Sequence, residues 1–536
     1  MSFMTRAALL TLILLGAGCA YLPDGDPAQS RLVCRSDAEC AEGQVCFADG
    51  CGDPGQNIVV EVTPNPKAGL HAQDFVVENL RPQQNLELFG AATLQGEVRR
   101  EALVSTPGAE TVAYSSPVSL RVSGESLLIP GVTRRYEATL VPDNGSYQLA
   151  VGSGSFTVTL LTADPQVPPV VDSRRVEPGG TVPLDFVLPA ATSLVRLAGK
   201  VVRQGTVLVD ADLEVQAVDE SLRPLSQRVP VTRGTGEFVL ALSPSATART
   251  HVLVQVTAPR TGELVPQKTF TVDPRPGVTA PLELGDYGEP VRVTGRVVGL
   301  DGRPVAGATV ALRGQVGGGG TFHGPLATTG PEGRFTVDTL PAAPGGTLSL
   351  VVVPPLGATA GLTVQPVEVP RTGAVLPDVV CPNRRLVRGT IHLPGSTHAA
   401  PGVRVAVEPV AEVPGWPRPP GGGEALGTTG DNGDFQLRLD PAVYRVDFIP
   451  AENLPRVSLV VTVLPGEDTA EQRLATFALQ RGRTLRGRVT EGTRALPYAS
   501  LRFYRAVTLE GRPSSVLLAQ TVSDHAGRYT ALIPVR

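Results

Sequence analysis

Apolar and polar residues alternate along most of this chain, in short runs separated by turns that are rich in glycine and proline. The stretch VTGRVVGLDGRPVAGATVAL, residues 293–312, is typical, because two alternating runs flank a polar turn that contains Asp301 and Gly302. A period of two places one side of a strand in a core and the other in water, whereas an amphipathic helix repeats every three to four residues. The pattern therefore predicts β-hairpins and an all-β fold.

The first strand of this stretch recurs along the chain. Aligned by its central glycine, it gives five copies, and successive glycines are 103, 96, 94 and 98 residues apart. A repeat of this length fits one small β-sandwich and is too long for a solenoid. Apolar residues stand two positions before and after each glycine, and the triplets are Leu94/Gly96/Val98, Leu197/Gly199/Val201, Val293/Gly295/Val297, Val387/Gly389/Ile391 and Leu485/Gly487/Val489.

A second alternating strand follows in each copy, and then a tight turn of the form G-x-[Phe/Tyr]. The turn glycine permits a positive φ, and the aromatic residue begins the next inward-facing row. Aromatic residues make up only 4% of the chain, so we expect these five to anchor five cores. We also expect each ring to cover the bare glycine of the first strand in its own copy. The turn pairs are Gly145 and Tyr147, Gly236 and Phe238, Gly333 and Phe335, Gly433 and Phe435, and Gly527 and Tyr529.

The third copy carries a longer motif, G-x-V…G-x-P-V-x-G-A-x-V…T-x-x-x-G-x-F, almost complete over residues 295–337. The fourth copy keeps PGVRVAV and TTGDNGDFQL, and the fifth keeps LPYASLRFY and TVSDHAGRYTA. These copies resemble the carboxypeptidase regulatory-like domain, a non-catalytic, transthyretin-like β-sandwich. The first two copies share little beyond the glycine triplet and the aromatic turn, so we include them because of the period. The resemblance implies tandem Greek-key sandwiches of about seven strands each, and no enzyme.

The N-terminus has the features of an export signal. Arg6 precedes an uncharged run over residues 7–17, which ends in small residues directly before Cys19. Residues 1–18 resemble a bacterial lipoprotein signal, which implies that Cys19 carries a lipid; an ordinary secretory signal cleaved nearby is the alternative. Because Ala20 and not Asp follows Cys19, we expect the outer membrane as the destination. No later stretch is long and apolar enough to predict a transmembrane helix.

Four of the six cysteines cluster within residues 34–51 of the segment 19–56, at spacings that do not match the paired C-x2-C of zinc sites. In an exported chain they predict two disulfides, with three possible pairings, in a stiff spacer above the membrane. We expect Cys381, which alternates like a strand residue, to be buried and free. The clustered cysteines are Cys34, Cys40, Cys46 and Cys51.

Other chemistry is sparse. The net charge of -4 is spread without basic or acidic blocks, so the chain lacks a nucleic-acid footprint. The six histidines are scattered over different copies, and zincin, nucleophile-elbow and P-loop motifs are missing, so we expect no enzyme, no metal and no cofactor. The remaining candidate is Trp416, in a Pro/Gly-rich loop between the second strand and the aromatic strand. Residues 314–324 and 505–516 occupy the same place in their copies, and all three loops are expected to be flexible connectors or recognition loops.

The fifth copy ends nine residues after Gly527, at Arg536, and lacks the strand that follows the aromatic strand elsewhere. We expect a truncated sequence, or else a strand donated by a partner. The sequence thus predicts a non-enzymatic, lipid-anchored rod that serves as a stalk or binding scaffold for envelope proteins or glycans. A carbohydrate-binding module and an accessory subunit of a separate enzyme are alternatives. The expected boundaries are 1–18 for the signal, 19–56 for the Cys-rich segment, and 57–174, 175–275, 276–372, 373–470 and 471–536 for the five sandwiches.

Overall fold

Antiparallel β-strands make up nearly all of the regular structure. Within the described residues, the other elements are one short helix, α1 (Pro244–Thr247), and the 3-10 turns η2 (Pro66–Ala68) and η3 (Gly317–Gly319). The all-β prediction is therefore confirmed. The computed structural model describes residues 45–47, 50–52, 58–77, 83–89, 92–102, 111–207, 212–249, 251–258, 264–275, 280–420, 425–451, 454–465, 471–509 and 512–534.

Every sandwich is built from two sheets on one plan. The first, glycine-centred strand lies in the middle of one sheet, between the antiparallel aromatic strand and short parallel strands that end the copy. The second strand and the two strands after the aromatic strand form the other sheet. The chain thus crosses between the sheets, and the apolar residues that alternate along both sets of strands meet in the core between them.

The first two sandwiches differ mainly in their additional edge strands. In the first, one sheet holds β6 (Ala92–Glu101), β7 (Thr111–Ala113), β10 (Ser146–Val151), β13 (Thr181–Pro183) and β14 (Phe186–Leu188), and the other holds β8 (Val118–Glu125), β9 (Thr133–Leu140), β11 (Gly154–Thr162) and β12 (Val170–Val176). In the second, they are β15 (Val195–Arg203), β16 (Thr206–Val207), β19 (Glu237–Leu242) and β22 (Ala280–Glu283), against β17 (Glu214–Val218), β18 (Val229–Pro230), β20 (Val252–Thr257) and β21 (Lys268–Val272).

The third and fourth sandwiches match each other closely. The third has β23 (Val291–Gly299), β27 (Arg334–Thr339), β30 (Ala374–Val375) and β31 (Val379–Cys381), against β24 (Thr309–Val316), β25 (Gly320–His323), β26 (Ala327–Thr328), β28 (Leu348–Val353) and β29 (Thr363–Val367). The fourth has β32 (Arg385–His392), β35 (Asp434–Leu439), β38 (Gln472–Arg473) and β39 (Phe477–Ala478), against β33 (Arg404–Ala411), β34 (Ala425–Thr428), β36 (Ala442–Ile449) and β37 (Val457–Val463).

The fifth sandwich is assembled from both ends of the described chain. Strand β3 pairs antiparallel with β42, with Val60 opposite Phe503, and β4 extends the same sheet. Strand β5 lies parallel to β40 in the other sheet, with Leu86 opposite Val489. Its strands are β40 (Gly482–Glu491), β41 (Arg494–Ala495), β42 (Ser500–Leu509), β43 (Arg512–Val522) and β44 (Arg528–Pro534), with β3 (Ile58–Thr63), β4 (Gln73–Val77) and β5 (Leu86–Glu87).

The expectation that the fifth sandwich lacks a strand is therefore wrong, because the N-terminal segment supplies it. The same register recurs in all five copies: the residue two positions after the central glycine faces the last strand of its sandwich. Residues 58–87 thus occupy the places that β36, β37 and β39 take in the fourth sandwich. The five facing pairs are Val98 and Phe186, Val201 and Leu282, Val297 and Val379, Ile391 and Phe477, and Val489 and Leu86.

The strand pairing also moves the expected domain boundaries. Residues 57–91 were assigned to the first sandwich, but β3, β4 and β5 pair with the fifth. Each boundary placed at 174, 275, 372 or 470 separates the closing parallel strands from the sandwich that they complete. These strands are short and precede the next copy directly, so their sequence pattern alone does not show which glycine strand they join.

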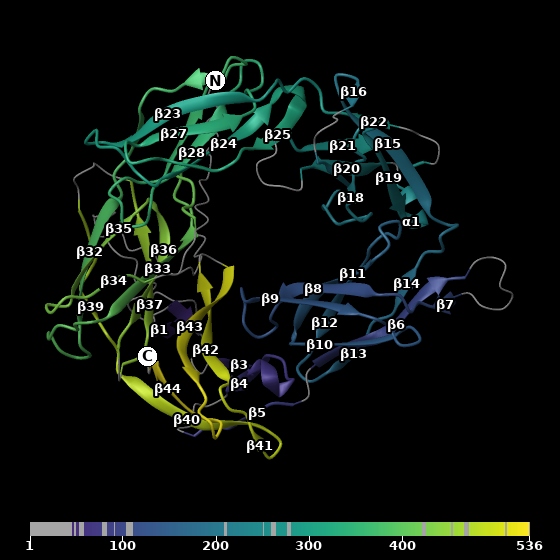
Figure 1. The fold of residues 1–536 in the computed structure, drawn as a ribbon. Coiled ribbons are helices and arrows are strands. Elements are labelled where there is room, and N and C mark those ends of the chain that lie inside the picture. The colour runs from purple at the N-terminus through teal and green to yellow at the C-terminus, as the bar shows by residue number, and fades with distance from the viewer. Residues whose placement is uncertain are drawn as a thin grey trace, which may run out of the picture.

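The five sandwiches follow one another around a closed ring, and not along a rod (Figure 1). The ring closes where the first sandwich meets the fifth. There the Arg134 guanidinium of β9 lies against the Glu61 carboxylate of β3 at 3.3 Å and forms a shorter ion pair with Asp74 of β4. Ile129 packs beside them on Val59 and Tyr504. Burial alone would lower the pKa of Arg134, but the Asp74 charge raises it overall, so the buried cation is compensated.

The aromatic residues of the turns lie over the first-strand glycines in the third, fourth and fifth copies, as the sequence predicts, whereas in the first copy Leu184 and Asp185 lie nearest to Gly96. In the third and fourth copies a Cβ on Gly295 would lie 2.8 Å from the Phe335 ring, and one on Gly389 would lie 2.6 Å from the Phe435 ring. In all five copies the two residues are direct partners across the strand pair. The turn glycines all have positive φ, between +69° and +89°. They are Gly145, Gly236, Gly333, Gly433 and Gly527.

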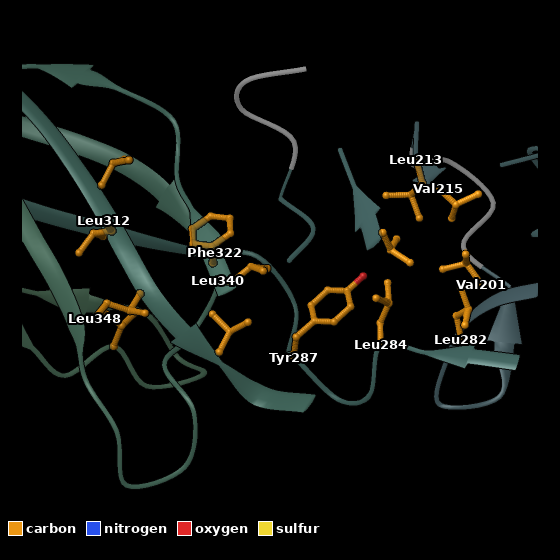
Figure 2. Close-up of a cluster of buried hydrophobic side chains, with 14 of the residues drawn as sticks. Val201, Leu213, Val215, Leu282, Leu284, Tyr287, Leu312, Phe322, Leu340 and Leu348 are labelled. Carbon is orange, nitrogen blue, oxygen red and sulfur yellow. The ribbon is translucent and has the colours of Figure 1, made fainter. Parts of the chain in front are cut away.

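The second and third sandwiches share one continuous core. Leu282 and Leu284 continue the core of the second sandwich into the linker, and Tyr287 extends it toward Leu340 of the third (Figure 2). Arg203 lies over the Tyr287 ring, 4.2 Å from its centroid, and donates to the Gly288 carbonyl at 2.7 Å. This junction is therefore packed like a protein interior, and the two sandwiches are not joined by a flexible linker alone.

Candidate functional site

The loops singled out by the sequence as connectors or recognition loops lie at the junctions of the ring. In every sandwich the loop after the second strand faces the preceding sandwich. In the second sandwich, Gln227 of this loop donates its side-chain amide to the carbonyls of Asp164 and Val167 in the first, at 2.9 Å each. In the first sandwich, Ile129 of the corresponding loop packs on the fifth sandwich.

The glycine-rich loop of the third copy packs closely against the linker that precedes this sandwich, which accounts for its glycines. A Cβ on Gly317 would lie 2.0 Å from the Asp286 carbonyl oxygen, and one on Gly318 would lie 2.1 Å from that of Leu284. Only glycine allows the loop to approach the linker this closely. Thr321 also forms a two-way backbone bridge with Gln267 of the second sandwich, at 2.7 and 2.8 Å. The expectation of a flexible connector is therefore wrong for this loop.

In the fifth copy the corresponding hairpin contacts two neighbours. Ser515 donates to the Pro130 carbonyl of the first sandwich at 2.8 Å. Val516 and Arg505 line a small cavity together with Val457 of the fourth sandwich. This loop thus contributes to ring closure, and its position is fixed from both sides.

The fourth copy holds Trp416, the candidate ligand residue. Its ring is half-buried, and its backbone N–H donates to the Val413 carbonyl at 2.9 Å. Trp416 does not line the cavity at the junction of the third and fourth sandwiches, whereas Pro419 and Pro420 of the same loop do. The tryptophan therefore lies beside the cavity, and the prolines form part of its wall.

This cavity, of about 400 Å³, lies where the third and fourth sandwiches meet. Its wall from the third sandwich runs through residues 353–357, and the exposed side chain of Leu356 lies at this edge. The fourth sandwich contributes consecutive residues of β35 and the apolar side chains of Leu437, Leu439 and Val407. A cavity of this size and lining suits an apolar group.

The polar groups at the base of the cavity are already paired. Asp440 accepts the backbone N–H of Leu362 at 2.7 Å and the Arg384 Nε at 3.1 Å. Arg384 also donates to the Pro355 carbonyl at 2.8 Å, and its side chain is 5% exposed. The Tyr444 hydroxyl donates to the Asp440 carbonyl at 2.9 Å, and burial raises the pKa of Tyr444. These bonds clamp the third sandwich to the fourth.

The rim of the cavity is different, because Gln436 and Arg438 are exposed there. Among the strands that the structure describes, β35 is the edge of its sheet and pairs on one side only, with β32. The site therefore combines an apolar interior, a basic side chain and a free strand edge. The sequence indicated only the loop that holds Pro419 and Pro420, since the other walls come from residues 353–357 and 384–444 of two different copies.

The other predicted site residues have separate outcomes. Cys19, Cys34 and Cys40 lie outside the described residues, so lipidation and the disulfides stay predictions. Cys46 and Cys51 are backbone partners across the short hairpin of β1 (Val45–Phe47) and β2 (Gly50–Gly52). Cys381 is buried and unpaired as predicted, and burial raises the pKa of its thiol.

Within the described part of the chain, no group of three or more His, Cys, Asp or Glu side chains is arranged to hold a metal ion. Among the same residues, no helix has the length and apolar character needed to cross a membrane.

Comparison with known proteins gives no family. No family model matches the chain, and no curated protein matches it, so the resemblance to the carboxypeptidase regulatory-like domain stays a prediction. Similar solved structures include a streptococcal ancillary pilin, with 14% identity over 52% of this chain and 97% of the pilin, at a TM-score of 0.21. The TIE protein of Bacillus anthracis has 11% identity over 72% and 74%, at 0.17. A minor pilin of Streptococcus agalactiae has 9% identity over 36% and 95%, at 0.18. At such scores the likeness carries no argument about function.

Proposed function

We propose that this protein is an exported, non-enzymatic scaffold, anchored by a lipid on Cys19, whose five sandwiches form a closed ring. The ring holds binding surfaces in a fixed arrangement above the membrane for protein partners of the cell envelope. The N-terminal position of the anchor and the ring geometry together suggest that the fifth sandwich lies nearest the membrane, because residues 58–87 belong to it.

The observation that carries this proposal is the closure of the ring. The loop after the second strand contacts a neighbour in sandwich after sandwich, and buried polar contacts such as the Leu362 N–H with the Asp440 carboxylate join adjacent sandwiches. Such contacts favour a rigid body over a chain of independent beads. Rigid presentation suits a scaffold, since partners then meet preordered surfaces.

The anchor is tested by fractionation of cells that express Cys19→Ala. The variant should leave the membrane fraction and appear in the soluble exported fraction. Cys381→Ala is the matched control, because this cysteine is buried in the third sandwich and should not affect anchoring. Retention of Cys19→Ala in membranes would contradict the lipid anchor.

The disulfides of the Cys-rich segment are tested by mass spectrometry without reductant. The proposal requires two bridges among the four clustered cysteines and a free thiol at Cys381. Stoichiometric zinc in this segment would contradict it.

Glycan binding has less support than a protein scaffold. Sugar platforms use exposed aromatic rings, and Trp416 is half-buried and does not line the cavity between the third and fourth sandwiches. A glycan array probed with the intact chain and with Trp416→Ala separates the two functions, since only a glycan-binding module would give signals that the substitution removes. The accessory-subunit function is tested by cross-linking in envelopes, where it requires an enzyme among the captured partners.

A further inference from the structure

Strand β35 presents unpaired backbone groups along one side. The carbonyl of Arg388 in β32 accepts the N–H of Leu474 at 2.7 Å, so it faces away from β35. Gln436, the residue opposite Arg388, is therefore not bonded to β32, and its N–H and C=O point to the free edge. The same alternation applies to Arg438, two residues on. Within the described structure, these four groups have no backbone partner.

The apolar cavity runs beside this free edge. Five consecutive residues, Gln436 to Asp440, line it, and its lining also includes Pro409, Pro419 and Pro420. Five residues of strand correspond to roughly 16 Å. Because the cavity follows the backbone of an edge strand, its shape suits an extended chain better than a compact ligand.

Charge adds a preference. Asp440 is engaged by the buried Arg384, whereas the exposed Arg438 has no ion pair with any described residue. An acidic side chain placed beside β35 would therefore meet an uncompensated guanidinium. A strand added to β35 would turn alternate side chains into the cavity and toward Arg438.

We propose that the free edge of β35 binds an extended peptide segment of a partner protein by strand addition, with apolar side chains in the cavity and acidic ones beside Arg438. The segment spans about five residues, and main-chain hydrogen bonds to Gln436 and Arg438 fix its register. This site deepens the proposed scaffold function by naming the class of partner. A ring that is clamped at this junction keeps the cavity open before the partner arrives.

The probe is a fluorescein-labelled, end-blocked hexapeptide of alternating valine and glutamate, titrated into the intact chain and followed by fluorescence anisotropy. Saturable binding is expected, and the bound peptide should slow hydrogen exchange at the amides of Gln436 and Arg438. A peptide with serine in place of valine should bind at least about tenfold more weakly, because it leaves the cavity unfilled.

The edge is tested with Gln436→Pro, which removes the outward N–H but is tolerated on an edge strand. Thr336→Pro is the matched control, since Thr336 follows Phe335 in β27 just as Gln436 follows Phe435 in β35. Gln436→Pro should weaken binding at least about tenfold and Thr336→Pro should leave it unchanged. Arg438→Glu should reverse the charge preference of the site. A hexapeptide of alternating valine and lysine should then bind better than the valine–glutamate peptide.

Three results would overturn the peptide assignment. The first is no saturable binding up to millimolar peptide, or binding that Gln436→Pro does not affect. The second is self-association of the chain that Gln436→Pro abolishes, which would assign the edge to a second copy. The third is binding without amide protection, which would assign the cavity to a small apolar ligand. The lipid anchor of the proposed scaffold is tested separately by fractionation, so its failure is distinguishable from the failure of this site.

Discussion

Leu86 lies opposite Val489 in a parallel strand pair, although the two residues come from opposite ends of the described chain. Beside this pair, the Tyr529 hydroxyl donates to the Gln84 carbonyl at 2.6 Å, and the Asn85 side chain accepts the N–H of Arg488 at 3.1 Å. The N-terminal segment thus completes the fifth sandwich and, by its contacts with Arg134, closes the ring. The stability of the C-terminal strands therefore depends on the N-terminus.

This dependence is tested with Val60→Asp. Val60 is fully buried opposite Phe503, so an unpaired carboxylate there should destabilise the fifth sandwich by more than about 3 kcal/mol. The amides of β42 and β44 should lose protection in hydrogen exchange while those of the second sandwich keep theirs. Val76→Asp, on the 42%-exposed side chain of β4, should have little effect. Equal exchange in both variants would contradict the role of the N-terminal strands.

The buried charges at ring closure give a second prediction. Arg134→Ala leaves Asp74 buried without its cation and removes one cation beside Glu61, which keeps Arg502 at 3.7 Å, and this should cost about 3–5 kcal/mol. Arg121→Ala removes an exposed pair with Glu137 in the same sandwich and should cost about 0–1 kcal/mol. Denaturant unfolding, together with exchange at the first and fifth sandwiches, measures the difference. Similar small losses in both variants would show that the junction does not depend on this ion pair.

The glycine loop between the second and third sandwiches offers a matched pair. Gly318 and Gly319 both have positive φ, at +73° and +77°, but only a Cβ on Gly318 meets the linker. Gly319→Ala should cost about 1–2 kcal/mol from backbone strain alone. Gly318→Ala should cost more and should also raise exchange at the Gln267–Thr321 bridge. If both variants lose the same stability, close packing against Leu284 is not the reason for this loop's composition.

The core anchors give a fourth prediction. Phe335 is 4% exposed and covers Gly295, so Phe335→Ala should destabilise the third sandwich by roughly 3–5 kcal/mol. Phe89→Ala, where the ring is 61% exposed, is the control and should change the stability by less than about 0.5 kcal/mol. Thermal unfolding of both variants is the measurement, and comparable melting temperatures would argue against the anchor role.

Glu283 predicts a pH dependence at the junction of the second and third sandwiches. Its burial tends to raise the carboxyl pKa, but the N–H groups of Gly205, Gly285 and Gln204 and the charge of Lys268 lower it overall. A lowered folded pKa means that this stabilisation is present above the unfolded pKa and is lost as pH falls through the folded pKa. Near neutral pH, Glu283→Gln should therefore show less hydrogen-exchange protection at the junction than the parent chain. In acid, the protection of the variant and that of the parent should become similar. A difference that stays constant with pH would exclude this carboxylate as the cause.

The sequence by itself determined the strands and the repeat. Alternation is a local property, so Leu94, Val98 and their counterparts revealed the inward face of each first strand without any knowledge of its neighbours. The pairing of Gly295 with Phe335 was also accessible, because a bare glycine in a strand and an aromatic residue after a hairpin both follow from local chemistry.

Only the tertiary structure decided which strands share a sandwich. The apolar alternation of Ile58–Thr63 is the same whether the strand pairs with β42 or with a strand of the first sandwich, because alternation specifies a face and not a partner. For the loops around Gly318 and Trp416, the sequence likewise showed the residues present but not which neighbouring sandwich they contact. The cavity beside β35 required two sandwiches to be placed side by side, and that placement depends on long-range contacts such as Leu362 with Asp440.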